Sequence, residues 1–92
     1  MAENLRTIKK DINFLTEELL FDCCMFMELN PGKNQAEAME LINQAISLRD
    51  ELLSRVNSIR EKPAKPHFKQ LRAEMVEKAN GLFEKISELA KQ

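Results

Sequence analysis

The chain has 92 residues, of which 14 are basic and 15 acidic, so its formal net charge is -1. This length suits a single domain over residues 1–92 with a modest core, and the balanced charge excludes bulk attraction to nucleic acid or to an anionic membrane. Two Gly, three Pro and no Tyr or Trp leave few turn signals and little strand-forming content, which predicts an all-α fold.

The first predicted helix spans residues 3–29. Apolar side chains recur along it at steps of three and four, which places them in one stripe. The members of this stripe are Leu5, Ile8, Ile12, Leu15, Leu19, Cys23 and Phe26. The run 19–29 is apolar at nine of its eleven positions, and a helix that is apolar all round is buried on more than one side. The helix is therefore expected to have a second apolar face in its C-terminal half.

This second apolar face is the predicted partner-binding surface. Phe14, Phe21 and Met25 fall nearly opposite the first stripe, while the other members lie on its flank or margin. Monomers rarely leave a contiguous apolar patch in water, and a symmetric homodimer is the commonest way to cover one. The predicted contacts with a second copy or with another helical protein are Phe14, Leu20, Phe21, Cys24, Met25 and Met27. A docked dimer and a helix-swapped dimer both remain open.

The two cysteines are adjacent, and their side chains diverge by about 100° on a helix, so they cannot form a normal disulfide with each other. We expect Cys23 to fill the core and Cys24 to fill the second interface; the alternative is a redox switch in which Cys24 bridges two protomers. The N-terminus lacks the apolar core of a secretory signal, and the run 19–29 is about half the ~20 residues that cross a membrane. We therefore predict a soluble, cytoplasmic protein without membrane contact.

The second predicted helix spans residues 35–62. Asn30, Pro31 and Gly32 end the first helix, and Asn34 followed by Glu37 is typical of a capping box. The short connection predicts antiparallel neighbours. Arg49 lies inside the apolar stripe of this helix, where its height in the hairpin predicts an ion pair with Glu17 or Glu18.

The third predicted helix spans residues 66–91, with Pro66 as its first residue after the break at 63–66. Gly81 interrupts its pattern, for which close packing or simple tolerance is the expected reason rather than a hinge. Three helices of similar length joined by two short connections predict an elongated up-down-up antiparallel bundle that dimerises through its first helix.

The sequence carries no motif for catalysis or for a cofactor. It has no phosphate loop, dinucleotide fingerprint, zinc-protease motif or nucleophile elbow, and its single histidine, His67, has no other ligand at metal spacing. Carboxylate pairs such as Glu84 and Glu88 fall on polar faces. We therefore expect no enzyme activity, no metal, no cofactor and no small-molecule substrate.

Basic residues gather at one end of the predicted bundle. Residues 1–11 and 55–73 meet there and carry nine basic against three acidic side chains, whereas the remainder is strongly acidic. The free amide groups at the start of the third helix lie at the same end. This predicts an alternative function, the binding of a phosphate-rich or acidic partner, nucleic acid included. The predicted contacts are Lys9, Arg60, Lys62, Lys65, His67, Lys69 and Arg72.

The function that the sequence favours is that of a small non-enzymatic module that self-associates or docks a partner through the apolar face of its first helix. Methionine and phenylalanine suit an adaptable apolar contact.

Overall fold

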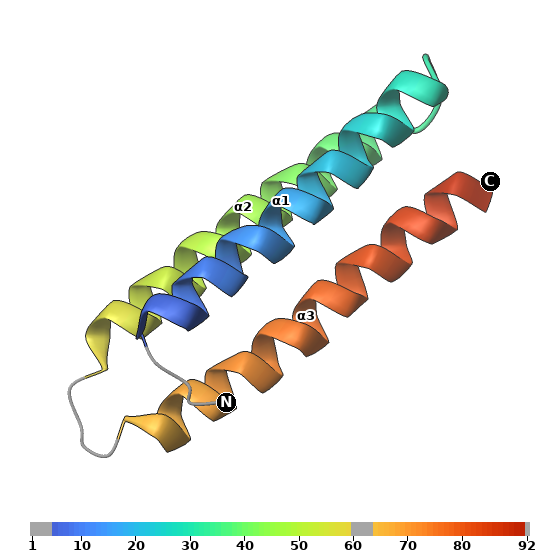
Figure 1. The fold of residues 1–92 in the computed structure, drawn as a ribbon. Helices are drawn as coiled ribbons and strands as arrows, with labels where there is room; N and C mark the ends of the chain where they lie inside the picture. The colour runs from blue at the N-terminus through green and yellow to red at the C-terminus, as the bar shows by residue number, and fades with distance from the viewer. Residues whose placement is uncertain (1–4, 60–63, 92) are drawn as a thin grey trace.

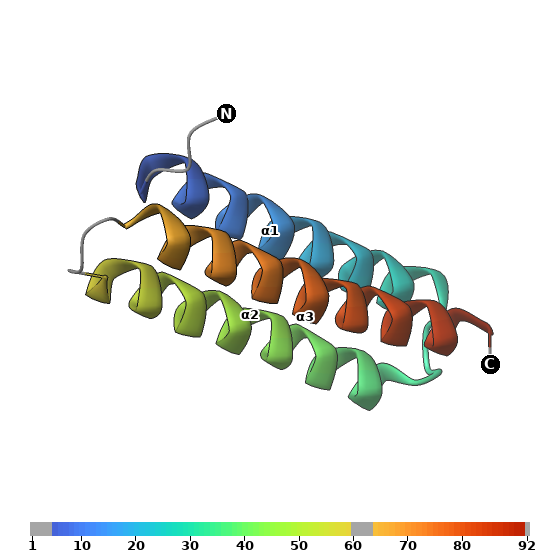
Figure 2. The same ribbon diagram turned by 90° about the horizontal axis from the view of Figure 1, so that it is seen from below.

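The computed structural model describes residues 5–59 and 64–91. They form three helices, α1 (Leu5–Leu29), α2 (Gln35–Ser58) and α3 (Lys65–Lys91), and no strand occurs in these two ranges. The helices run up, down and up side by side in a rod of 50 × 19 × 15 Å (Figures 1 and 2). This confirms the predicted elongated all-α bundle. None of the described helices is long and apolar enough to cross a membrane.

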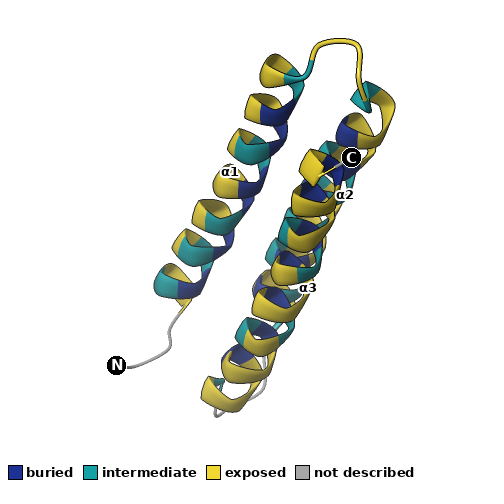
Figure 3. Ribbon diagram, turned by 90° about the vertical axis from the view of Figure 1, so that its right-hand side faces the viewer, coloured by how far each residue is buried: buried dark blue, intermediate teal, exposed yellow. Residues whose placement is uncertain are grey.

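The core runs along the axis of the bundle, where each helix turns one stripe inward (Figure 3). On α1 the buried positions recur every three or four residues and are Ile8, Ile12, Thr16, Leu19, Cys23 and Phe26. Five of them belong to the predicted stripe. Its other two members differ, since Leu15 is half-buried and Leu5 is 43 % exposed, and Thr16 was not predicted. The hydroxyl of Thr16 donates a hydrogen bond of 2.9 Å to the carbonyl oxygen of Ile12, so its burial leaves no unpaired donor. Every helix contacts both others, and one chain thus closes its own core.

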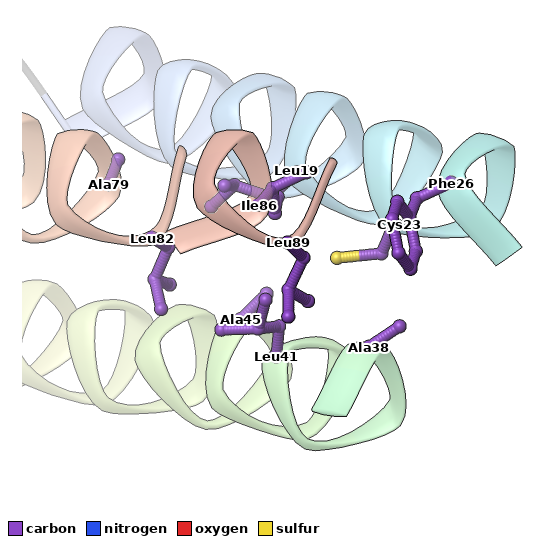
Figure 4. Close-up of a cluster of buried hydrophobic side chains, with 10 residues drawn as sticks. All are labelled: Leu19, Cys23, Phe26, Ala38, Leu41, Ala45, Ala79, Leu82, Ile86 and Leu89. Carbon is purple, nitrogen blue, oxygen red and sulfur yellow. The ribbon is translucent and has the colours of Figure 1, made fainter. Parts of the chain in front are cut away.

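The buried side chains form two clusters, one near each end of the rod. The cluster beside the α1–α2 turn is drawn in Figure 4 and consists of Leu19, Cys23, Phe26, Ala38, Leu41, Ala45, Ala79, Leu82, Ile86 and Leu89. The cluster at the opposite end consists of Ile8, Ile12, Leu52, Val56, Phe68, Leu71 and Met75. Leu15 and Leu48 pack against both clusters and so join them.

The α1–α2 turn is closed by Gln35 and not by the predicted capping box. Asn34 adopts a left-handed conformation (φ 53°) and its side chain makes no capping hydrogen bond. Instead the Gln35 amide donates to the carbonyl oxygens of Asn30 (2.8 Å) and Lys33 (3.2 Å). The capping-box prediction was wrong because a left-handed Asn34 does not aim its side chain at the first amides of α2.

The end of α2 also differs from the prediction. The helix stops at Ser58, and Ile59 is extended with φ -70° and ψ 118°. This change of direction lets the side chain of Ile59 pack against the apolar cluster at that end. The predicted continuation through residues 60–62 lies outside the described residues. On the far side, α3 begins at Lys65, one residue before Pro66.

Ion pairs connect neighbouring helices at the surface of the bundle. Asp11 of α1 lies 2.7 Å from Arg72 of α3. On the α2–α3 side, Arg55 donates a hydrogen bond to Glu74, which lowers the pKa of that carboxyl. Arg49 instead pairs with the adjacent Asp50 at 3.1 Å, and the predicted pair with Glu17 or Glu18 is absent from the described residues. Pairing with the adjacent Asp50 avoids the entropy cost of ordering two long side chains across a helix interface.

Candidate interaction surface on α1

The outer side of α1 carries a stripe of exposed apolar side chains. Phe14 keeps 59 % and Phe21 62 % of its surface in solvent, and Met25 is also exposed. At 3.6 residues per turn these three lie within about 40° of one another, nearly opposite the buried stripe. Figure 3 shows this outer side as largely exposed along the length of the helix. The three predicted central residues of the surface therefore do share one solvent-facing stripe.

Two of the other predicted members lie elsewhere. Leu20 and Met27 are half-buried and pack against the core cluster near the α1–α2 turn. They border the exposed stripe without forming its centre. Cys24 is exposed and lies on the same flank.

The sequence-based prediction missed one member of the stripe, Leu29. It lies four residues after Met25 on the same side of α1 and is the most exposed large apolar side chain described, at 72 %. The helical spacing carried this signal, but position 29 was treated only as the end of the helix. We call Phe14, Phe21, Met25 and Leu29 the outer stripe.

Charged residues beside the outer stripe change sign along the helix. Arg6 and Lys10 precede Phe14 on the flank that also holds Cys24, and Glu17 and Glu28 follow on that flank. All four are exposed. Neither Lys10 nor Glu28 makes an ion pair with any residue of the described ranges. The flank is therefore positive at one end and negative at the other, with charges that are not neutralised there.

The adjacent cysteines have opposite environments. Cys23 is buried in the core, and burial, with the nearby Cys24 and Asp22, raises the pKa of its thiol to about 11. A neutral thiol of this kind is a packing residue and a poor nucleophile. The prediction that Cys23 fills the core is confirmed. Cys24 remains available to solvent or to a partner.

The predicted basic end is partly neutralised within the chain. Arg72 is held by Asp11, and Arg55, which belongs to the same end, is held by Glu74. Lys65, His67 and Lys69 are exposed at the start of α3, and Lys9 is half-buried on α1. Arg60 and Lys62 lie outside the described residues. Ion pairs within the chain therefore neutralise two of the basic side chains at this end.

Shallow grooves lie between α2 and α3. One, of about 290 Å³, lies beside Ser54, Arg55 and His67. Another, of about 260 Å³, lies beside Leu48 and Gly81. A further one, of about 280 Å³, is lined by three carboxylates, Lys85 and two leucines. In the part of the chain that the structure describes, no three His, Cys, Asp or Glu side chains are grouped to hold a metal ion.

Comparison of the chain with protein-family models, with curated proteins and with solved structures found no match in any of the three.

Proposed function

We propose that this protein is a small non-enzymatic interaction module that docks on a helical protein surface, a second copy of itself or a foreign partner, through the outer stripe of α1. The observation that carries the proposal is the exposure of two phenylalanines, Phe14 and Phe21, on one face of a helix whose opposite face is fully buried. Aromatic and methionine side chains on a contiguous surface are typical of protein interfaces.

Two features of the fold support docking over helix exchange. Each of the three helices already packs against both others within one chain, and the core stripe of α1 is buried without a partner. The apolar side chains of the outer stripe therefore do not contribute to the packing of the bundle core. The proposal includes a cytoplasmic location, which the two free cysteines support.

Site-specific photocrosslinking tests this function for any partner that the cell contains. A photoreactive phenylalanine analogue is placed at Phe21 in producing cells, and as a matched control at Met39, an exposed apolar residue of α2. We expect a discrete covalent adduct from position 21 that position 39 does not give. The absence of an adduct at 21, or the same adducts from both positions, would overturn the proposal.

A substitution in the purified protein provides the second test. Phe21→Asp puts a charge at the centre of the outer stripe but leaves the core untouched, so the helical content should stay unchanged. Association measured by light scattering, with the protein itself or with the partner identified by crosslinking, should be lost. Met39→Asp should leave it intact. If Phe21→Asp associates like the unmodified protein, the outer stripe is not the interface.

A second candidate function, binding of a phosphate-rich or acidic partner at the basic end, has narrower support. Lys65, His67 and Lys69 are exposed in the first two turns of α3, and the N-terminus of a helix favours an anion. The internal pairs of Arg55 and Arg72 reduce the charge that this end offers. Binding to a random nucleic-acid duplex at low and moderate salt tests it, because phosphate contacts must weaken steeply as salt rises. No salt-dependent binding would remove this function.

A further inference from the structure

We propose that the occupant of the outer stripe is a second copy of this chain, docked with its α1 antiparallel and with Lys10 of each copy opposite the partner's Glu28. This inference rests on the proposed function of the outer stripe and names its partner.

The argument starts from the charge order along one flank of α1. Lys10 and Glu28 lie at nearly the same angle around the helix, because 18 residues make five whole turns at 3.6 residues per turn. Both are exposed, and neither has an ion-pair partner in the described ranges. A surface with a cation at one end and an anion at the other complements its own copy when that copy is reversed.

Symmetry then selects the antiparallel arrangement. A two-fold axis perpendicular to two antiparallel helices brings the same flank of each copy together, so both Lys10–Glu28 contacts form at once. A parallel pair brings opposite flanks together at equal height. Glu17 of one copy would then face the partner's Glu18, and this repulsion would occur twice. In the reversed copy the two ends of this flank meet charges of opposite sign, since each Lys10 lies opposite the partner's Glu28.

The same register also brings the apolar residues together. When Lys10 is opposite the partner's Glu28, Phe14 lies at the height of the partner's Cys24 and within about one helical turn of the partner's Phe21. Two such phenylalanine contacts form, one on each side of the axis, where offset or edge-to-face aromatic packing is favourable. The positions of the apolar residues and of Lys10 and Glu28 therefore favour the same antiparallel register.

Two contacts oppose it. Glu17 of the two copies lie about 6 Å apart along the helix axis on the flank of Lys10 and Glu28, because each is two residues from the centre of this register. Glu18 of the two copies approach each other near the axis on the opposite flank. Both carboxylates are exposed at the rim, where water and salt screen their repulsion. A single helix face makes a small interface, so we expect association at micromolar concentrations and above.

Charge reversal in the whole chain tests the arrangement. Lys10→Glu and Glu28→Lys each turn two attractive contacts into two repulsive ones, and each should weaken self-association by about tenfold or more at low salt. The double variant, and an equimolar mixture of the two single variants, should both recover association. Glu84→Lys, an exposed reversal on α3, is the matched control and should have no effect. Circular dichroism checks that all variants stay helical.

A zero-length carbodiimide crosslink gives a direct reading of the orientation. Lys10 and Glu28 of one chain are about 27 Å apart along the helix, so a Lys10–Glu28 amide found by mass spectrometry must join two chains. We expect this crosslink in the unmodified protein and its loss in Phe21→Asp.

The outcomes separate this inference from the proposed function. If Phe21→Asp abolishes a dimer in which Lys10 and Glu28 do not crosslink and charge reversal has no effect, the antiparallel arrangement is wrong and docking through the outer stripe stands. If the protein is monomeric at hundreds of micromolar while position 21 crosslinks to a different protein, the second copy is the wrong partner. If position 21 gives no adduct and the protein is monomeric, both fall.

Discussion

Cys23 and Cys24 are neighbours in the chain but have opposite environments. Cys23 is buried in the core cluster with Phe26 and Ala38 (Figure 4), whereas Cys24 lies at the surface. One residue along a helix is a rotation of about 100°, enough to move a side chain from the inside to the outside of a three-helix bundle.

This difference predicts that the two thiols react at very different rates. At pH 8, and at a concentration where the protein is monomeric, a maleimide should modify Cys24 quickly, because that thiol is exposed, and should leave Cys23 unmodified until the protein unfolds. Mass spectrometry of the labelled protein checks this, first in buffer and then in denaturant. Cys24→Ser should abolish the fast reaction. Modification of both thiols in buffer at similar rates would contradict the burial of Cys23.

Cys23 also predicts a loss of stability in alkali. Burial raises the pKa of its thiol from 9.0 to about 11, so the unfolded chain releases this proton at lower pH than the folded chain. The stabilisation is therefore fully present below pH 9 and is lost as the pH rises toward 11. The free energy of unfolding should fall by up to about 2–3 kcal/mol over this interval.

Urea unfolding at pH 8 to 10.5 measures this fall, and Cys23→Ala is its control. The two proteins differ only at position 23, so the difference between their pH profiles isolates Cys23. Parallel profiles would show that this thiol does not couple ionisation to folding.

A pair of identical substitutions on α1 separates its two faces. Leu19 is 1 % exposed and Leu29 is 72 % exposed. Leu19→Ala removes buried methyl groups and leaves a cavity, which should cost about 2–5 kcal/mol of unfolding free energy. Leu29→Ala should change it by less than about 0.5 kcal/mol at a concentration where the protein is monomeric. Chemical denaturation checks both, and equal costs would mean that Leu29 belongs to the intrachain core.

The two glycines should respond to alanine in opposite directions. At Gly81 an added methyl group would meet no atom within 4 Å, and α3 runs through this position, so close packing does not explain the glycine. Gly81→Ala should therefore stabilise the helix by about 1 kcal/mol. Gly32 has φ 77°, which strains any residue with a side chain, and Gly32→Ala should destabilise the protein by about 1 kcal/mol.

Thermal unfolding of the two glycine variants gives the comparison directly. A loss of stability on Gly81→Ala would point instead to a need for bending at this position of α3.

The sequence by itself determined the number of helices and most of the inward stripe of α1. Ile8, Ile12, Leu19 and Phe26 were placed correctly because burial in a helix follows a period of 3.6 residues, which is a local property of the chain. The exposure of Phe14 and Phe21 was predicted for the same reason, because neither residue belongs to the stripe that this period defines.

Only the tertiary structure decided which side chains at the edges of the buried stripes contact a neighbouring helix. Leu20 and Met27 pack against the core cluster near the α1–α2 turn, and Arg72 pairs with Asp11 of α1. These contacts depend on the distance and register of neighbouring helices, which no local pattern carries. The hydrogen bonds of the α1–α2 turn also depend on the tertiary structure. Asn34 adopts a left-handed backbone conformation, and the side chain of Gln35 donates the hydrogen bonds that close the turn.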